Sequence, residues 1–326
     1  MRIWYLVPEY SEPSWGIGML YGHVELLRRD GHDALAVHTH AGFRPPWLES
    51  DVPAVGDDGF RPGSDDVVVV PEVLVDDPRV SAGGRRVLFV QNAFSLLERL
   101  DAAATARQRG FVRAMAVLPH VQHAIRGLAD LPSEVVPPYV APYFTAPAGS
   151  LVDARPPRVV IHAKSYIREL PVLRRILDLA IRGELPGMVR GRPVEQLARW
   201  RVAELQGLTH REAAEALRQA CLFVNLNCWE AFNTTVPEAM AAGAVPVCYE
   251  AYGGRDFLRD GDNAFVFPNN SLLPLVDRLI DLMAAPEPER EAQLVAVRRR
   301  AWETAARYTP AATAAALRSF FEGMGR

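Results

Sequence analysis

The stretch that decides the fold runs from Glu230 to Gly243 and reads EAFNTTVPEAMAAG. A short apolar run at 222–224 comes before it, and a second at 244–247 follows it, which predicts strand, loop, helix and strand. Glu230 then stands in the loop at a strand's carboxyl end, and Glu238 stands in the first turn of the helix. Parallel sheets bind ligands at that edge. Two ionised carboxylates there suit a polyhydroxylated ligand, because they are pure hydrogen-bond acceptors.

The spacing of these two glutamates, with seven residues between them, resembles the signature of retaining glycosyltransferases with the GT-B fold. These form the large family of sucrose synthases and bacterial mannosyltransferases (glycosyltransferase family 4-like, "glycosyl transferases group 1"). Residues 252–258 and 260–268 also resemble that family. A simpler interpretation is a capping box from Thr235 to Glu238, in which the glutamate only satisfies backbone donors. The capping box explains one glutamate but not the sequence around it.

Length and composition allow two soluble domains in the 326 residues. The net charge of −3 gives no general attraction to nucleic acid. No apolar run approaches the ~20 residues that span a bilayer, and the first ten residues lack a signal-peptide layout, so we expect a cytoplasmic protein. Peripheral contact with a membrane and the oligomeric state stay open. The three cysteines, Cys221, Cys228 and Cys248, are expected to be reduced thiols.

Alternating apolar runs and helical periods predict two doubly wound, Rossmann-like α/β domains. Strands are expected at 2–7, 34–38, 67–70, 87–90 and 114–118, and then at 159–161, 222–224, 245–247 and 265–267. Helices are expected at 19–29, 120–126, 170–182, 209–220, 271–283, 289–307 and 309–321. The proline-rich segment 141–157 is the expected linker. The domains would cover 1–145 and 155–308. The resemblance implies an interdomain cleft and a last helix, 309–326, that crosses back to the first domain.

Lys164 is the only lysine in the sequence and follows the predicted strand 159–161. A fixed cation at that edge would stabilise the charge that develops on a leaving diphosphate. The family places an arginine and a lysine after the equivalent strand. Here His162 and Ala163 precede Lys164, so we carry the role over to Lys164 and, as a second candidate, to Arg168. Chance survival of a surface lysine and a solvated helix-face arginine are the alternatives.

The resemblance implies that Glu238 binds the nucleotide ribose and that Glu230 contacts the sugar ring. Backbone N–H groups and hydroxyls of Thr234 and Thr235, at the helix amino terminus, would bind donor phosphate or sugar. The other donor-binding candidates are Phe232 and Asn233, in the same loop, and Gln206 and Leu208, whose loop precedes a helix capped by Thr209 and should contact the base. Many relatives have glycines where Ala231 and Asn233 stand, which leaves open how closely this backbone approaches the sugar.

In the first domain, Gly16 and Gly18 precede the predicted helix 19–29 and resemble the family's glycine-rich loop, although a plain turn would also use them. Retaining relatives often have a histidine after a later strand. Gln91 and Asn92 stand there instead, and amides cannot serve as bases. We count Asn92 as a catalytic candidate. His120, after the following strand, is a candidate substitute, with a capping or surface histidine as the simpler alternative.

The sequence predicts a retaining hexosyltransferase that moves a sugar from a donor such as a UDP- or GDP-sugar to an unidentified acceptor hydroxyl. No metal or other cofactor is expected. Asp260-Gly261-Asp262 matches a metal-binding Asp-x-Asp pattern, but it lies before a strand and is expected to form a turn. Two other functions stay open: a nucleotide-sugar epimerase of the GT-B type, and a non-catalytic protein that binds nucleotide sugars.

Overall fold

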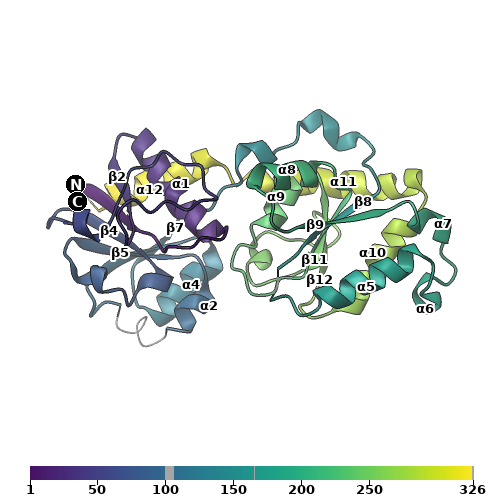
Figure 1. The fold of residues 1–326 in the computed structure, drawn as a ribbon, viewed down its shortest axis with the longest axis horizontal. Coiled ribbons are helices and arrows are strands. Elements are labelled where there is room, and N and C mark those ends of the chain that lie inside the picture. The colour runs from purple at the N-terminus through teal and green to yellow at the C-terminus, as the bar shows by residue number, and fades with distance from the viewer. Residues whose placement is uncertain (100–105, 165, 325–326) are drawn as a thin grey trace. The chain divides into compact units, whose positions relative to one another are not determined.

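The computed structural model describes residues 1–99, 106–164 and 166–324. The chain forms two compact units. The first unit combines Met1–Tyr139 with Tyr308–Arg326, and the second is Val140–Arg307. Each is built on a parallel sheet with helices beside it, so the predicted α/β class is confirmed (Figure 1).

The first unit has a seven-stranded sheet in the order β3-β2-β1-β4-β5-β6-β7. Every neighbouring pair is parallel. The strands are β1 (Arg2–Leu6), β2 (Asp33–Val37), β3 (Ala54–Val55), β4 (Val67–Pro71), β5 (Arg85–Val90), β6 (Phe111–Ala116) and β7 (Ser133–Val135). Strand β4 is buried along its whole length. Strands of this kind are covered on both faces, which is why they read as unbroken apolar runs in the sequence.

Two pairs of helices accompany this sheet: α1 (Trp15–Arg29) with α12 (Pro310–Glu322), and α2 (Ala93–Leu97) with α4 (Pro119–Leu128). Helix α12 lies beside α1, where Arg318 pairs with Asp30 at 3.2 Å (Figure 1). Helix α1 begins at Trp15, four residues before the predicted start, so Gly16 and Gly18 form its first turn and not a loop before it. Short 3-10 helices at Asp57–Gly59, Glu72–Leu74 and Pro78–Ser81 complete the unit.

The second unit has a five-stranded parallel sheet in the order β12-β11-β10-β8-β9. The strands are β8 (Arg158–His162), β9 (Arg201–Leu205), β10 (Leu222–Asn225), β11 (Val245–Tyr249) and β12 (Phe265–Phe267). Strand β9 was not predicted, because this edge strand is only partly buried and reads RVAEL, without an apolar run.

The helices of the second unit fall into two groups. Helices α8 (His210–Arg218), α9 (Thr235–Ala241) and α11 (Glu287–Ala305) lie together, and α5 (Leu170–Ile181), α6 (Pro186–Val189), α7 (Val194–Leu197) and α10 (Leu272–Ala284) form the other group. Figure 1 shows the sheet between the two groups. Thr209 and Glu212 form the predicted capping box at the start of α8. Trp200 is buried in the core, where its indole N–H donates to the carbonyl of Met283 at 2.8 Å.

The predicted linker 141–157 packs onto the second unit and does not hang free. It contains two 3-10 helices, Pro142–Phe144 and Ala148–Val152, with the side chains of Phe144 and Leu151 buried. The amide of Ala146 donates to the carbonyl of Ala241 at 2.8 Å. The break between the units therefore falls at residues 139 and 140, earlier than the linker.

The register of the second sheet decides which residues share its carboxyl edge. Val224 of β10 pairs with Ile161 of β8, and His162 of β8 pairs with Leu205 of β9. The three strands therefore end side by side. The segments that follow them, which carry Lys164, Gln206 and Glu230, all leave the sheet at this one edge.

Candidate functional site

Two buried asparagines hold the loop that carries Glu230. Asn225 ends strand β10, and Asn227 lies two residues on; both are at most 1% exposed. The amide of Asn227 donates to Asn225 Oδ1 at 2.8 Å, and the amide of Trp229 donates to Asn227 Oδ1 at 3.0 Å. Side-chain oxygens thus satisfy backbone donors where the strand ladder has ended, and they fix the path of the chain toward Glu230.

The side-chain nitrogen Nδ2 of Asn225 contacts three other side chains. It lies 2.8 Å from Asn233 Oδ1, 3.0 Å from Thr235 Oγ1 and 3.1 Å from His162 Nδ1. Burial lowers the pKa of His162 to about 4, and the Lys164 ammonium acts in the same direction, so the imidazole is neutral at pH 7. Its Nδ1 can then accept a hydrogen bond. This hub ties β8 to the loop and to the first turn of α9.

Asn233 adopts a backbone conformation that favours glycine. Its φ is +52°, in the left-handed region that glycine adopts freely and asparagine tolerates. The residue is 2% exposed, and its Nδ2 has no partner among the described residues. The loop is tightly packed on its other side: a Cβ added at Gly253 would lie 1.1 Å from the carbonyl oxygen of Ala231. Phe232 stacks in the core against Phe257, with ring centroids 5.7 Å apart.

Glu238 lies in the first turn of α9, but it is not a cap. The N-cap residue is Thr234, with no side-chain hydrogen bond to the helix. The Thr235 hydroxyl is turned toward Asn225 and His162. The capping-box interpretation is therefore wrong for this helix. Burial raises the pKa of Glu238 to about 8, and the nearby Glu230 carboxylate raises it as well. A carboxyl group kept neutral by its surroundings is typical of a functional site.

Glu230 interacts with several charged and polar groups of the second unit. Its Oε1 accepts a hydrogen bond from the Tyr166 hydroxyl at 3.1 Å. Burial raises the pKa of Glu230, while Tyr166, the Lys164 ammonium and Asn227 oppose that rise. The structure thus brings Glu230 within electrostatic reach of both Lys164 and Glu238, and the roles of the three residues stay predictions.

The other predicted residues of the second unit lie along the same edge. Lys164 and Arg168 are both exposed, and Arg168 stands just before helix α5. Gln206 and Leu208 flank Gly207, whose φ of +67° turns the chain between β9 and α8. Their positions agree with the prediction, and their binding roles stay predictions.

The first unit's carboxyl edge is organised by a residue that the sequence reading missed. Glu72 is buried directly after β4 and accepts hydrogen bonds from the amides of Gln91, at 3.1 Å, and Asn92, at 3.0 Å. Burial raises its pKa to about 7. Gln91 in turn donates to the carbonyl of Gly16 at 3.2 Å, in the first turn of α1. A glutamate two residues after a run of four valines, with Pro71 between them, was the available signal.

Asn92 has a structural role at the carboxyl edge of the first sheet. Its Oδ1 accepts from the amide of Phe94 at 2.9 Å and caps α2. His120 is the second residue of α4, after β6. A Cβ built on Gly18 would point into open space, with nothing beyond its chain neighbours and its own helix backbone within 4 Å. The roles proposed for Asn92, His120, Gly16 and Gly18 stay predictions.

Asp260 and Asp262 belong to a turn, as expected. Gly261 has a φ of +72°, and Asp260 Oδ1 accepts from the amide of Val266 at 2.9 Å. Across the described residues, no group of three His, Cys, Asp or Glu side chains could hold a metal ion. The three cysteines are free. No helix in the described part of the chain is long and apolar enough to cross a bilayer.

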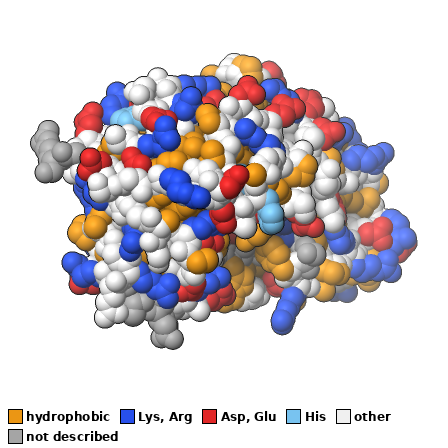
Figure 2. Space-filling view, turned by 60° about the vertical axis from the view of Figure 1, so that its left-hand side comes forward, with side chains coloured by type: hydrophobic (Ala, Val, Ile, Leu, Met, Phe, Trp, Pro, Cys, Tyr) orange, Lys and Arg blue, Asp and Glu red, His pale blue; other side chains and the backbone are white. Residues whose placement is uncertain are grey.

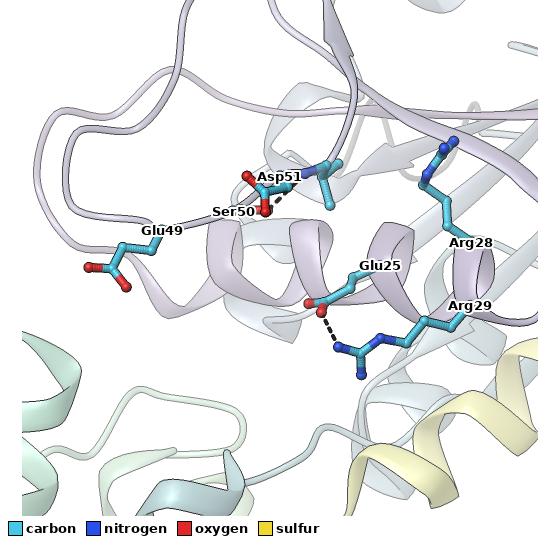
Figure 3. A pocket seen from close by; sticks show the side chains of 7 residues that line it. Glu25, Arg28, Arg29, Glu49, Ser50 and Asp51 are labelled. Atoms are coloured by element: carbon cyan, nitrogen blue, oxygen red, sulfur yellow. Dashed lines mark hydrogen bonds and ion pairs between the residues drawn. The ribbon is translucent and has the colours of Figure 1, made fainter.

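The surface of the protein mixes charges of both signs. On the face shown in Figure 2, acidic and basic side chains are interspersed. One pocket of about 490 Å³ lies beside the second half of α1, lined by Glu25, Arg28, Arg29 and residues 49–52 (Figure 3). Glu25 and Arg29 pair across one turn at 2.5 Å. The two arginines stand in the last turn of α1, just before β2 begins, so the pocket lies toward the amino ends of the first sheet's strands, away from the carboxyl edge that carries Glu72.

Comparisons with known proteins agree with this geometry. Residues 200–299 match the family model described as glycosyl transferases group 1. No curated protein matches the chain. HepE of Anabaena, solved in complex with UDP-glucose, is similar with a TM-score of 0.69 and 12% identity over 99% of this chain and 100% of its own. Sucrose-phosphate synthase from Thermosynechococcus elongatus has a TM-score of 0.72 and 10% identity over 99% of both chains.

A glycosyltransferase from Rickettsia africae is also similar, with a TM-score of 0.63 and 12% identity over 98% of this chain and 97% of its own. At such identities the likeness shows the fold, which is the GT-B fold that the sequence predicted. The matched segment 200–299 contains both glutamates, the asparagine hub and strands β9 to β12. The resemblance is thereby confirmed: the protein has the GT-B fold of glycosyltransferases, and residues 200–299 of its second unit match the model of the glycosyl transferases group 1 family.

Proposed function

We propose that this protein transfers a hexosyl group from a nucleotide sugar to an acceptor hydroxyl, with retention of anomeric configuration and without a metal ion. The observation that carries the proposal is the gathering of Lys164, Glu230 and Glu238 at one edge of the second sheet. One cation and two carboxyl groups match the three parts of such a donor: the diphosphate, the sugar hydroxyls and the ribose.

Donor binding follows from the chemistry of each group. Glu238, when ionised, accepts hydrogen bonds from two ribose hydroxyls, and Glu230 accepts from hydroxyls of the sugar. We expect main-chain groups of the loop 206–208, at the end of β9, to bind the base. The HepE structures hold UDP, UDP with glucose, or UDP-glucose. A uridine donor is therefore the first choice here, and a guanosine donor the second.

The transfer step breaks the bond between the sugar C1 and the diphosphate oxygen and forms a bond from C1 to the acceptor oxygen. Positive charge develops at C1, as in other glycosyl transfers, and negative charge grows on the departing oxygen. The Lys164 ammonium stabilises that oxygen, which takes the proton of the acceptor hydroxyl. Attack from the face that the phosphate leaves gives retention.

The first experiment is a calorimetric panel of UDP- and GDP-sugars, followed by incubation of each bound donor with monosaccharide and oligosaccharide acceptors. The coupling constant of the new anomeric proton reports retention or inversion. Lys164→Ala should abolish most turnover. Arg175→Ala is the matched control, because it removes another exposed cation of the same unit, in a surface pair with Asp178.

Three outcomes would overturn the proposal. An epimerised donor in the absence of any acceptor would make the protein an epimerase. Tight donor binding without turnover under every acceptor would make it a binding protein. An inverted product would keep the transferase and reject retention.

A further inference from the structure

Tyr166 is oriented against the usual preference of a tyrosine. The residue is 56% exposed, so its side chain is not part of the buried core. Its hydroxyl, however, makes two hydrogen bonds: it accepts from Asn227 Nδ2 at 2.7 Å and donates to Glu230 Oε1 at 3.1 Å. A tyrosine at a surface ordinarily keeps its polar end in water and buries its ring. Polar contacts therefore set the position of this side chain.

The side chain of Asn227, which holds the Tyr166 hydroxyl, is itself fixed in place. Asn227 is 1% exposed, and its own oxygen is committed to the amide of Trp229. Because the Asn227 oxygen is engaged, its side-chain nitrogen faces the site and donates one proton to the Tyr166 oxygen at 2.7 Å. The Tyr166 proton is then directed to Glu230. The chain of contacts runs from the end of β10, through the segment after β8, and back to the loop after β10.

We propose that Tyr166 is a positioning residue for Glu230, which holds one carboxylate oxygen so that the other is presented to the donor sugar. The inference rests on the proposed function, because it assigns a task within the same site. It adds a group that lies outside the two glutamates and the lysine. It also explains why a buried asparagine three residues before Glu230 is turned toward a surface tyrosine.

The hydroxyl also favours the ionised form of Glu230. The titratable and charged groups that act on Glu230 are Lys164 and Tyr166 after β8 and Glu238 on α9, with the Asn227 amide from its own loop. Burial raises the pKa of Glu230, and the Tyr166 hydrogen bond opposes that rise. Removing the hydroxyl therefore raises the pKa further, so the ionised form needed by the sugar is lost at a higher pH.

The test is Tyr166→Phe, which removes the hydroxyl and keeps the ring. Because the variant loses a hydrogen bond to a charged group, we expect about a tenfold fall in kcat and an acid limb of the pH–rate profile about one pH unit higher. The matched control is Tyr249→Phe. It removes another hydroxyl–carboxylate hydrogen bond, 2.7 Å to Glu169, in the same unit and should leave the acid limb in place.

A second measurement does not depend on activity. Carbon-13 NMR of glutamate-labelled protein follows the Glu230 carboxyl, assigned with Glu230→Gln, through a pH titration in wild type and Tyr166→Phe. An upward shift of its pKa in the variant supports the inference. An unchanged pKa, or equal acid limbs in Tyr166→Phe and Tyr249→Phe, overturns it. Absence of turnover in the wild type would instead reject the proposed function, whatever the NMR titration shows.

Discussion

Donor affinity should rise with pH through about 8, because Glu238 must lose a proton to accept both ribose hydroxyls. Burial raises the pKa of Glu238 to about 8, and the Glu230 carboxylate adds to that effect. A protonated carboxyl can accept with one oxygen but must donate with the other. The ionised form therefore binds the ribose best, and the pH of the solution decides how much of it is present.

The magnitude follows from the pKa. At pH 7, one unit below it, about a tenth of the molecules carry an ionised Glu238, so the apparent Kd should be about tenfold weaker than at pH 9. That factor corresponds to ~1.4 kcal/mol. The sign is fixed by linkage: a ligand that prefers the deprotonated form gains affinity as pH rises and reaches a plateau above the pKa of the free protein.

Isothermal titration with a nucleotide sugar from pH 6.5 to 9 measures this slope, and the diphosphate diester of such a donor has no proton to lose in that range. Glu238→Gln should bind weakly and with no pH dependence. Glu230→Gln should retain the dependence with a lower midpoint, since it removes the neighbouring charge. A flat Kd in the wild type, or the same slope in Glu238→Gln, would refute the reasoning.

Lys164→Ala should lower kcat by about a hundredfold, or ~3 kcal/mol, and change donor Kd less, because charge on the leaving oxygen is largest in the transition state; steady-state kinetics measure this, and near-normal turnover would pass the role to Arg168. Lys164→Arg should restore only part of the rate, since a forked guanidinium does not replace a compact ammonium. Transfer should persist in EDTA; loss of transfer that manganese restores would contradict the metal-free proposal. Asn225→Ala should lower the free energy of unfolding in urea by about 2–3 kcal/mol, because it leaves buried acceptors on Asn233 and Thr235 without their donor; a change below about 0.5 kcal/mol would show that the hub is dispensable.

The elements that the sequence revealed are those with a strong local signal. Runs such as 67–70 and 222–224 are buried on both faces, so their chemistry alone identifies them as strands of a parallel sheet. Strand β9 could not be predicted from the sequence, because it lies at an edge of the sheet and is only partly buried. The start of α1 at Trp15 could not be predicted either, because glycine disfavours a helix and two glycines stand in the first turn of α1.

In the candidate site, too, the sequence predicted the positions of single residues but not the contacts between distant segments. Lys164 and Glu230 lie in segments that follow apolar runs, and Glu238 lies in the first turn of the next helix, so position along the chain was enough to predict that they share one edge. Contacts between distant segments were beyond a sequence reading. Tyr166 and Glu230 are separated by 64 residues, and His162 and Thr235 by 73, so only the sheet register brings them together. The capping box at Thr235 failed because Asn225 and His162 compete for the same hydroxyl.

The placement of α12 has a consequence for the order in which the protein folds during synthesis. The first unit needs residues 308–324 against α1, yet the ribosome makes all of 140–307 before them. Until α12 has been made, one face of α1 lacks its partner helix. The second unit is a continuous stretch of the chain, so all of its residues are already available. We therefore expect the second unit to complete its folding first, although the first unit leaves the ribosome earlier.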